Sequence, residues 1–140
     1  MLKQVIDNDT FFELIKSELA LGKTASFTVK GSSMRPFYQD SKTVVTVIKP
    51  NQLKKHDVVL AHYQGKVILH RIIKIEENTL TLRGDATIKK EVVLLNNIFG
   101  VVLSHQTKRT IKEDHKGYRC LAYLWVKNPL RRFLLKLRSL

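Results

Sequence analysis

Residues 66–85, KVILHRIIKIEENTLTLRGD, set the fold class of this chain. Two runs, 66–76 and 79–83, are rich in β-branched residues and in leucine, and the polar pair Glu77-Asn78 separates them. Short β-branched runs around a polar turn are typical of an antiparallel β-hairpin. Such a hairpin returns the second run beside the first, so we expect Asp85, just after the second run, to lie near His70.

The same pattern extends outward in both directions. Similar runs occupy residues 26–31, 43–50, 57–63 and 98–105, and turn signals such as Lys49-Pro50-Asn51 and Gln64-Gly65 separate neighbouring runs. Five or six closely spaced strands predict a mainly β fold, a compact antiparallel sheet or half-open barrel.

The two ends of the chain have helical patterns instead. Residues 10–21 place Phe11, Leu14, Ile15 and Leu19 on one face, which predicts an N-terminal helix. Near the other end, an apolar stripe of Leu130, Phe133, Leu134 and Leu137 runs beside basic residues. We therefore divide one structural domain into an N-terminal helix (1–22), a β core (23–107) and a basic amphipathic tail (108–140), in which residues 110–117 read as a loop.

Composition places further limits on the chain. Its 140 residues include 25 Lys plus Arg against 12 Asp plus Glu, a formal net charge of +13. The excess is concentrated in the tail and favours an anionic partner. The single cysteine, Cys120, excludes an internal disulfide and a cysteine-based zinc site. We see no signal peptide, transmembrane span, metal site or cofactor motif, and expect a protein in the cytoplasm or peripheral at a membrane surface.

Residues 31–36, GSSMRP, follow the first predicted strand and present two hydroxyl groups. A serine needs a base to become a nucleophile, and His70 is the best candidate because a histidine pKa lies near neutrality. Asp85 could then orient the imidazole, and the backbone N–H groups of Gly31, Ser32 and Ser33 could bind an oxyanion. Each feature also has an ordinary structural reading: a polar turn, a core histidine and a turn aspartate.

Taken in order, GSSMRP, HDVV (56–59), HRIIKI (70–75) and LRGDA (82–86) resemble the four sequence boxes of the signal peptidase and LexA-like serine peptidase superfamily. The resemblance covers residues 24–103. It implies a LexA/signal peptidase-like half-open β-barrel. It also implies a nucleophile at Ser33, a base at His70 as in the histidine-using signal peptidases, and an aspartate at Asp85.

The resemblance also implies how substrate binds. The family holds an extended peptide as an added strand and cleaves after small residues, which places Gly31, Ser32, Met34 and Pro36 at the oxyanion and substrate-binding loop. Two departures leave a catalytically silent peptide-binding module open: His56 replaces a family glycine, and Asp40-Ser41 stands where many members have Gly-Asp. Most signal peptidases carry an N-terminal membrane anchor, and we expect none here.

Some residues carry weaker alternatives. Lys74 is an even number of residues from His70 and could share its strand face, which makes it a reserve base. The tail could pack on the barrel, lie on an anionic membrane through residues 118–140 with Tyr123 and Trp125 at the interface, or contact nucleic acid. Nucleic acid is the least supported partner, because aromatic and basic residues are not interleaved. The leading hypothesis is a serine endopeptidase that cleaves a leader, signal or precursor peptide.

Overall fold

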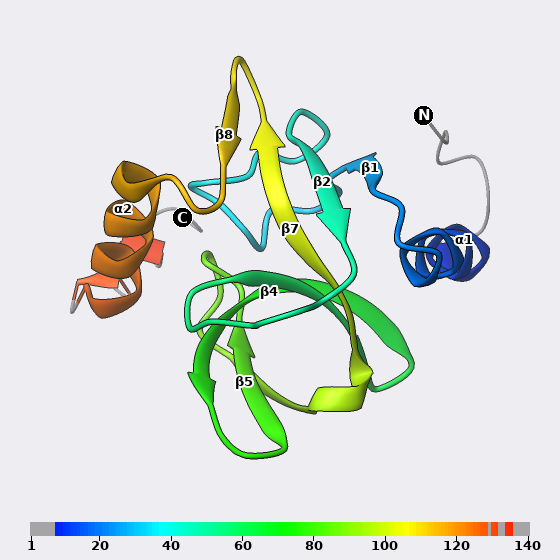
Figure 1. Ribbon diagram of the computed structural model, residues 1–140. Helices are drawn as coiled ribbons and strands as arrows, with labels where there is room; N and C mark the ends of the chain where they lie inside the picture. The colour runs from blue at the N-terminus through cyan, green and yellow to red at the C-terminus, as the bar shows by residue number, and fades with distance from the viewer. Residues whose placement is uncertain (1–7, 129, 132–133, 136–140) are drawn as a thin grey trace.

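A computed structural model describes residues 8–128, 130–131 and 134–135. Within this part of the chain, helix α1 (Asn8–Ala20) precedes the sheet and helix α2 (Lys116–Lys127) follows it (Figure 1). The strands, with a short 3-10 helix η1 (Leu95–Asn97) before β7, are β1 (Ala25–Thr28), β2 (Val44–Ile48), β3 (Val58–Tyr63), β4 (Lys66–Ile75), β5 (Thr79–Arg83), β6 (Lys90–Leu94), β7 (Ile98–Gln106) and β8 (Thr110–Lys112).

All strand pairs are antiparallel, and the sheet order is β1-β2-β7-β3-β4-β5-β6, with β8 added on β7. The sheet curls into the half-open barrel that Figure 1 shows. The predicted mainly β half-barrel with a helix toward each end is therefore confirmed. The predicted hairpin is also present: β4 pairs with β5, with Ile72 opposite Leu82.

Two apolar clusters hold the fold together. The amphipathic face of α1 places Phe11, Ile15 and Leu19 on the sheet, where they are almost fully buried with side chains of β1, β2 and β7. The second cluster fills the curl between β3 and β6. It includes Ile72 and Leu82, which face each other across the β4-β5 hairpin and line the same side of the sheet as the site described below.

Two strands were absent from the sequence prediction. β6 carries the alternating burial of a half-buried strand, with Glu91 and Val93 inward. β8 lies within residues 110–117, which the sequence analysis took for a loop. In the predicted tail stripe, Leu130 and Leu134 are exposed, whereas Phe133 and Leu137 lie outside the described residues.

Candidate active site

Ser33 and His70, 37 residues apart in sequence, meet in the folded chain. The Oγ atom of Ser33 lies 3.2 Å from Nε2 of His70, within hydrogen-bond reach. β4 holds the imidazole in place, and the loop after β1 presents the hydroxyl. This distance is at the outer limit of the range in which a histidine can take a proton from serine.

Glu91, not Asp85, lies behind the imidazole. Its Oε1 atom is 2.7 Å from Nδ1 of His70, and both side chains are about nine-tenths buried. Glu91 comes from β6, two strands away from β4 in the sheet order, and the curl of the sheet brings it inward. The resulting Ser33-His70-Glu91 line has the connectivity of a nucleophile, a base and an orienting carboxylate.

The prediction that Asp85 orients His70 is wrong in this geometry, because Arg71 holds both oxygens of its carboxylate. Nε of Arg71 donates to Oδ1 at 2.8 Å and Nη2 donates to Oδ2 at 2.7 Å. Asp85 is 2% exposed and Arg71 is fully buried. Burial, the largest single influence, would lower the pKa of Arg71. The charge of Asp85 and its hydrogen bonds, together with Tyr118 and Tyr38, outweigh burial and raise that pKa above its usual value.

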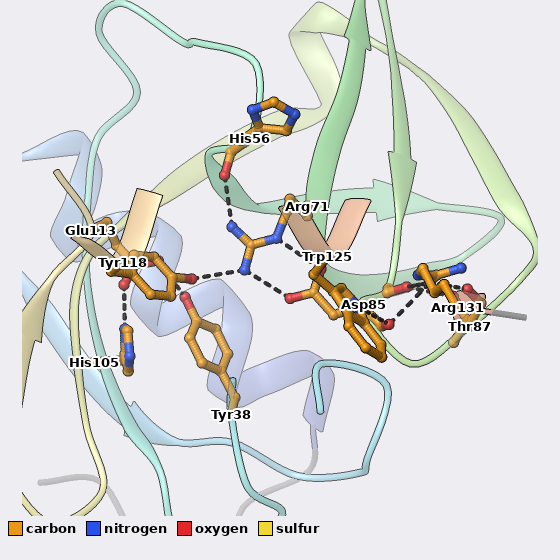
Figure 2. Close-up of polar contacts among 11 residues, drawn as sticks. Tyr38, His56, Arg71, Asp85, Thr87, His105, Glu113, Tyr118, Trp125 and Arg131 are labelled. Carbon is orange, nitrogen blue, oxygen red and sulfur yellow. Dashed lines mark hydrogen bonds and ion pairs between the residues drawn. The ribbon is translucent and has the colours of Figure 1, made fainter. Parts of the chain in front are cut away.

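Arg71 is the centre of a polar cluster that also reaches α2 (Figure 2). It donates to the carbonyl oxygen of His56 at 2.8 Å and to the hydroxyl oxygen of Tyr118 at 2.7 Å. Burial raises the pKa of Tyr118, so this hydroxyl stays protonated. The cluster joins β4, the loop before β3 and α2 into one unit.

The same loop that carries Asp85 supports the nucleophile. The N–H of Ala86 donates to the carbonyl oxygen of Ser33 at 2.8 Å. Gly84 must be glycine here, because a Cβ atom would lie 2.6 Å from the Ser33 carbonyl oxygen and 3.1 Å from Nε2 of His70. From the outside, Trp125 of α2 donates to the Asp85 carbonyl oxygen at 2.7 Å, and Arg131 donates to the carbonyl oxygens of this loop (Figure 2).

A cavity of about 270 Å³ opens beside the serine and histidine. Its two long walls are the segment 27–30, at the end of β1, and residues 67–70 of β4, and Phe12 of α1 lies at its side. Met34 and Leu60 also line it. β4 pairs with β5 only from Arg71 onward, and β1 is a terminal strand of the sheet order, so both walls are sheet edges.

The remaining predicted loop residues have different positions. Met34 is buried in the core and lines the cavity. Ser32 is exposed at the turn, and Pro36 lines a separate hollow beside α2. Gly31 has φ +87°, a left-handed conformation that suits glycine, and its N–H donates to Asp40 at 2.8 Å. That N–H is therefore engaged and is not an oxyanion donor in this structure.

Comparison with known families agrees with the fold and the sequence boxes. A family model described as Peptidase S24-like matches residues 3–103. The chain belongs to the Peptidase S24-like family. No protein in the curated collection of known proteins matches it. The family match includes Ser33, His70 and Glu91 but ends before β8 and α2.

Membership in the Peptidase S24-like family puts the two departures in context. His56, at the family glycine position, has φ +80°, so the turn keeps the backbone conformation that glycine would favour. Burial lowers the pKa of the His56 imidazole to about 4, with further lowering by Lys55, so that ring is neutral near pH 7. At the second departure, Ser41 is also left-handed, with φ 61°, and Asp40 accepts from its hydroxyl.

The prediction that Lys74 is a reserve base is wrong, because its side chain does not point to the site. A bulge between Ile72 and Lys74 breaks the alternation on which the prediction depended. The side chain of Lys74 is 65% exposed and pairs with Glu76 at 3.4 Å. Among residues 8–128, 130–131 and 134–135, no group of three His, Cys, Asp or Glu could hold a metal ion, and no helix could cross a membrane.

Proposed function

We propose that this member of the Peptidase S24-like family is a serine endopeptidase. The observation that carries the proposal is the line Ser33-His70-Glu91, with 3.2 Å and 2.7 Å between its hydrogen-bonding atoms, opening on an apolar cavity. A buried histidine between a carboxylate and a serine is the arrangement that activates a hydroxyl near neutral pH.

The chemistry follows from the positions of the two imidazole nitrogens. Nδ1–H of His70 donates to Glu91, which leaves Nε2 to accept the proton of Ser33 as Oγ attacks the scissile carbonyl carbon. Glu91 stabilises the imidazolium that forms, and Nε2–H then protonates the leaving amine as the C–N bond breaks. A water attacks the acyl ester by the same route in reverse, which releases the acid and restores Ser33. The backbone N–H of Ser33 is the candidate donor to the oxyanion.

The substrate would be a peptide segment in extended form. Its backbone would add as a strand between the β1 edge and residues 67–70 of β4, which supplies main-chain hydrogen bonds without a deep pocket. The apolar side chains of Val29, Val67 and Leu69 along this cleft favour small or apolar residues on the acyl side of the cleaved bond. A leader, signal or precursor peptide fits that description.

A serine-directed fluorophosphonate probe tests the proposal without knowledge of the substrate. We expect the parent protein and Ser32→Ala to be labelled, because Ser32 is exposed and is not paired with His70. Ser33→Ala and His70→Ala should lose labelling by about 10³-fold or more while they keep their cooperative unfolding transition. Labelling of folded Ser33→Ala at the parental rate would refute the assignment.

A silent peptide-binding module is the second candidate, and one observation favours it. Asp40 accepts the N–H of Gly31, so one of the three amides predicted for the oxyanion is occupied. If the folded parent protein resists the probe but binds unstructured peptides in the cleft, this reading replaces the endopeptidase. Substitution of Asp40 by alanine frees the amide and should then raise labelling.

A further inference from the structure

The outer side of α2 carries large apolar side chains that the barrel does not cover. Leu121 is 59% exposed and Leu124 is 56% exposed, whereas Tyr118 and Ala122 of the same helix are buried against the barrel. Pro36 and Phe37, just after the nucleophile loop, lie against the two leucines and complete an open apolar hollow. We call Pro36, Phe37, Leu121 and Leu124 the α2 patch.

The helix that carries the patch is firmly attached to the body of the protein. Tyr118 binds Arg71, and Trp125 binds the carbonyl oxygen of Asp85. Arg119 donates to the carboxylate of Asp57 at 2.7 Å. The buried side of α2 therefore accounts for its position on the barrel, and nothing in these contacts explains exposed leucines on the other side.

Two cationic side chains lie at the border of the α2 patch. Lys127 lines the hollow, and Arg35 is exposed next to Pro36. After Asp114 the sequence contains no acidic residue, and its basic residues are Lys116, Arg119, Lys127, Arg131, Arg132, Lys136 and Arg138. A polar side rich in Lys and Arg with leucines on the other side is typical of a helix that lies in the interface of an anionic bilayer.

We propose that the α2 patch docks on an anionic lipid bilayer, with Leu121 and Leu124 inserted among the acyl chains and Arg35 and Lys127 on the head groups. Trp125 is not an interfacial anchor in this arrangement, because its Nε1–H donates to the carbonyl oxygen of Asp85. Docking through Pro36 and Phe37 places the loop of Ser33 beside the membrane surface. The proposal does not depend on the catalytic role of Ser33.

Flotation with vesicles tests the apolar half of the proposal. The parent protein should bind vesicles of phosphatidylglycerol and phosphatidylcholine and bind pure phosphatidylcholine poorly. Leu121→Ser with Leu124→Ser should lower partitioning roughly tenfold or more, because each leucine leaves the apolar phase. The matched control, Leu21→Ser with Leu95→Ser, removes two leucines that are 71% and 46% exposed elsewhere and should not change it.

Charge reversal tests the other half. Arg35→Glu with Lys127→Glu should lower binding to anionic vesicles by about tenfold or more, and Lys74→Glu, at an exposed position of β4, should have little effect. Circular dichroism confirms that each variant is folded. Three results would overturn the proposal. The parent protein could bind neutral and anionic vesicles equally, or the two double leucine variants could bind anionic vesicles equally. The parent protein could also bind no vesicles and instead form a dimer that only the variant with Leu121→Ser and Leu124→Ser disrupts. The last result would assign the patch to a contact between copies of this chain.

Discussion

Two neighbouring residues of β4 each bind a buried carboxylate, and the two pairs have different surroundings. His70 holds Glu91, and Arg71 holds Asp85. Because successive side chains of a strand point to opposite faces, the first pair lies inside the curl beside the cavity and the second lies toward α2. The chain thus places a histidine that contacts a serine hydroxyl and a permanent ion pair one residue apart.

The difference between the pairs is access and protonation. His70 contacts a hydroxyl that lines a cavity, and an imidazole nitrogen can accept or donate a proton. Arg71 stays charged and donates hydrogen bonds to Asp85, to the His56 carbonyl oxygen and to Tyr118, and it is fully buried with Asp85. Burial of a charged pair therefore does not by itself mark the reacting group in this fold. The open cavity beside His70 is the feature that supports His70 as the proposed base.

The largest expected effect is on the chemical step and separates the two carboxylates. Glu91→Gln should slow probe labelling of Ser33 by about 10³-fold, because a neutral amide neither orients the imidazole correctly nor stabilises its charged form. The free energy of unfolding should change far less than the barrier, by about 1 kcal/mol. Labelling kinetics and urea unfolding on the same preparations give both quantities.

The chain supplies a matched control for this variant. Glu113 pairs with His105 in a second buried histidine–glutamate pair, which does not line the cavity. Glu113 also accepts from the Tyr38 hydroxyl at 2.6 Å. Glu113→Gln should reduce stability and leave the labelling rate within a few-fold of the parent. If both glutamine variants slow labelling equally, the role of Glu91 is structural, and the comparison between the two β4 pairs fails.

The next largest effect is on the free energy of unfolding and concerns the Arg71–Asp85 ion pair. Arg71→Met leaves Asp85 buried without its partner, which should cost about 3–5 kcal/mol in the free energy of unfolding. Urea denaturation measures the loss. Arg71→Met combined with Asp85→Leu should recover much of it, because an apolar pair no longer strands a charge. A single variant as stable as the parent would show that Asp85 is hydrated or protonated and that the ion pair does not stabilise the fold.

Local patterns were sufficient for most strands, and the order of the four boxes indicated Ser33 and His70 as partners. The hairpin of β4 and β5, the helix with Phe11 and Leu19, and the order of the four boxes are all readable from neighbouring residues. β6 was missed because its inward position carries a charge: Glu91 interrupts the apolar alternation that signals a strand. The residue that obscured the strand in the sequence is the one that contacts His70.

The error at Asp85 has a related cause. Proximity along the hairpin suggested His70, but β5 ends at Arg83, and Asp85 follows in the loop held by Arg71, Trp125 and Arg131. Glu91 reaches His70 only because the sheet curls across two intervening pairings, β4-β5 and β5-β6. Closure of a barrel depends on all its strands together, and no local spacing in the sequence reports it.

The smallest expected effect tests whether α2 stabilises the Arg71–Asp85 ion pair without affecting the site around Ser33. Tyr118→Phe removes the hydroxyl oxygen that accepts from Arg71 at 2.7 Å, inside the buried cluster. We expect a loss of about 1.5–3 kcal/mol in the free energy of unfolding, the usual contribution of a hydrogen bond to a charged group. Tyr123→Phe, on the same helix but 49% exposed, is the control and should cost less than about 0.5 kcal/mol.

Labelling of Ser33 in the Tyr118→Phe variant should stay within about threefold of the parent, since the chemistry runs through Glu91 on the other face of β4. A loss of labelling approaching that of Glu91→Gln would contradict this separation of the two faces. In that case, α2 would set the position of the loop from Gly84 to Ala86, and through the hydrogen bond of Ala86 the position of Ser33 itself. The His70–Glu91 and Arg71–Asp85 pairs would then be energetically coupled, and the attachment of α2 would affect the reactivity of Ser33.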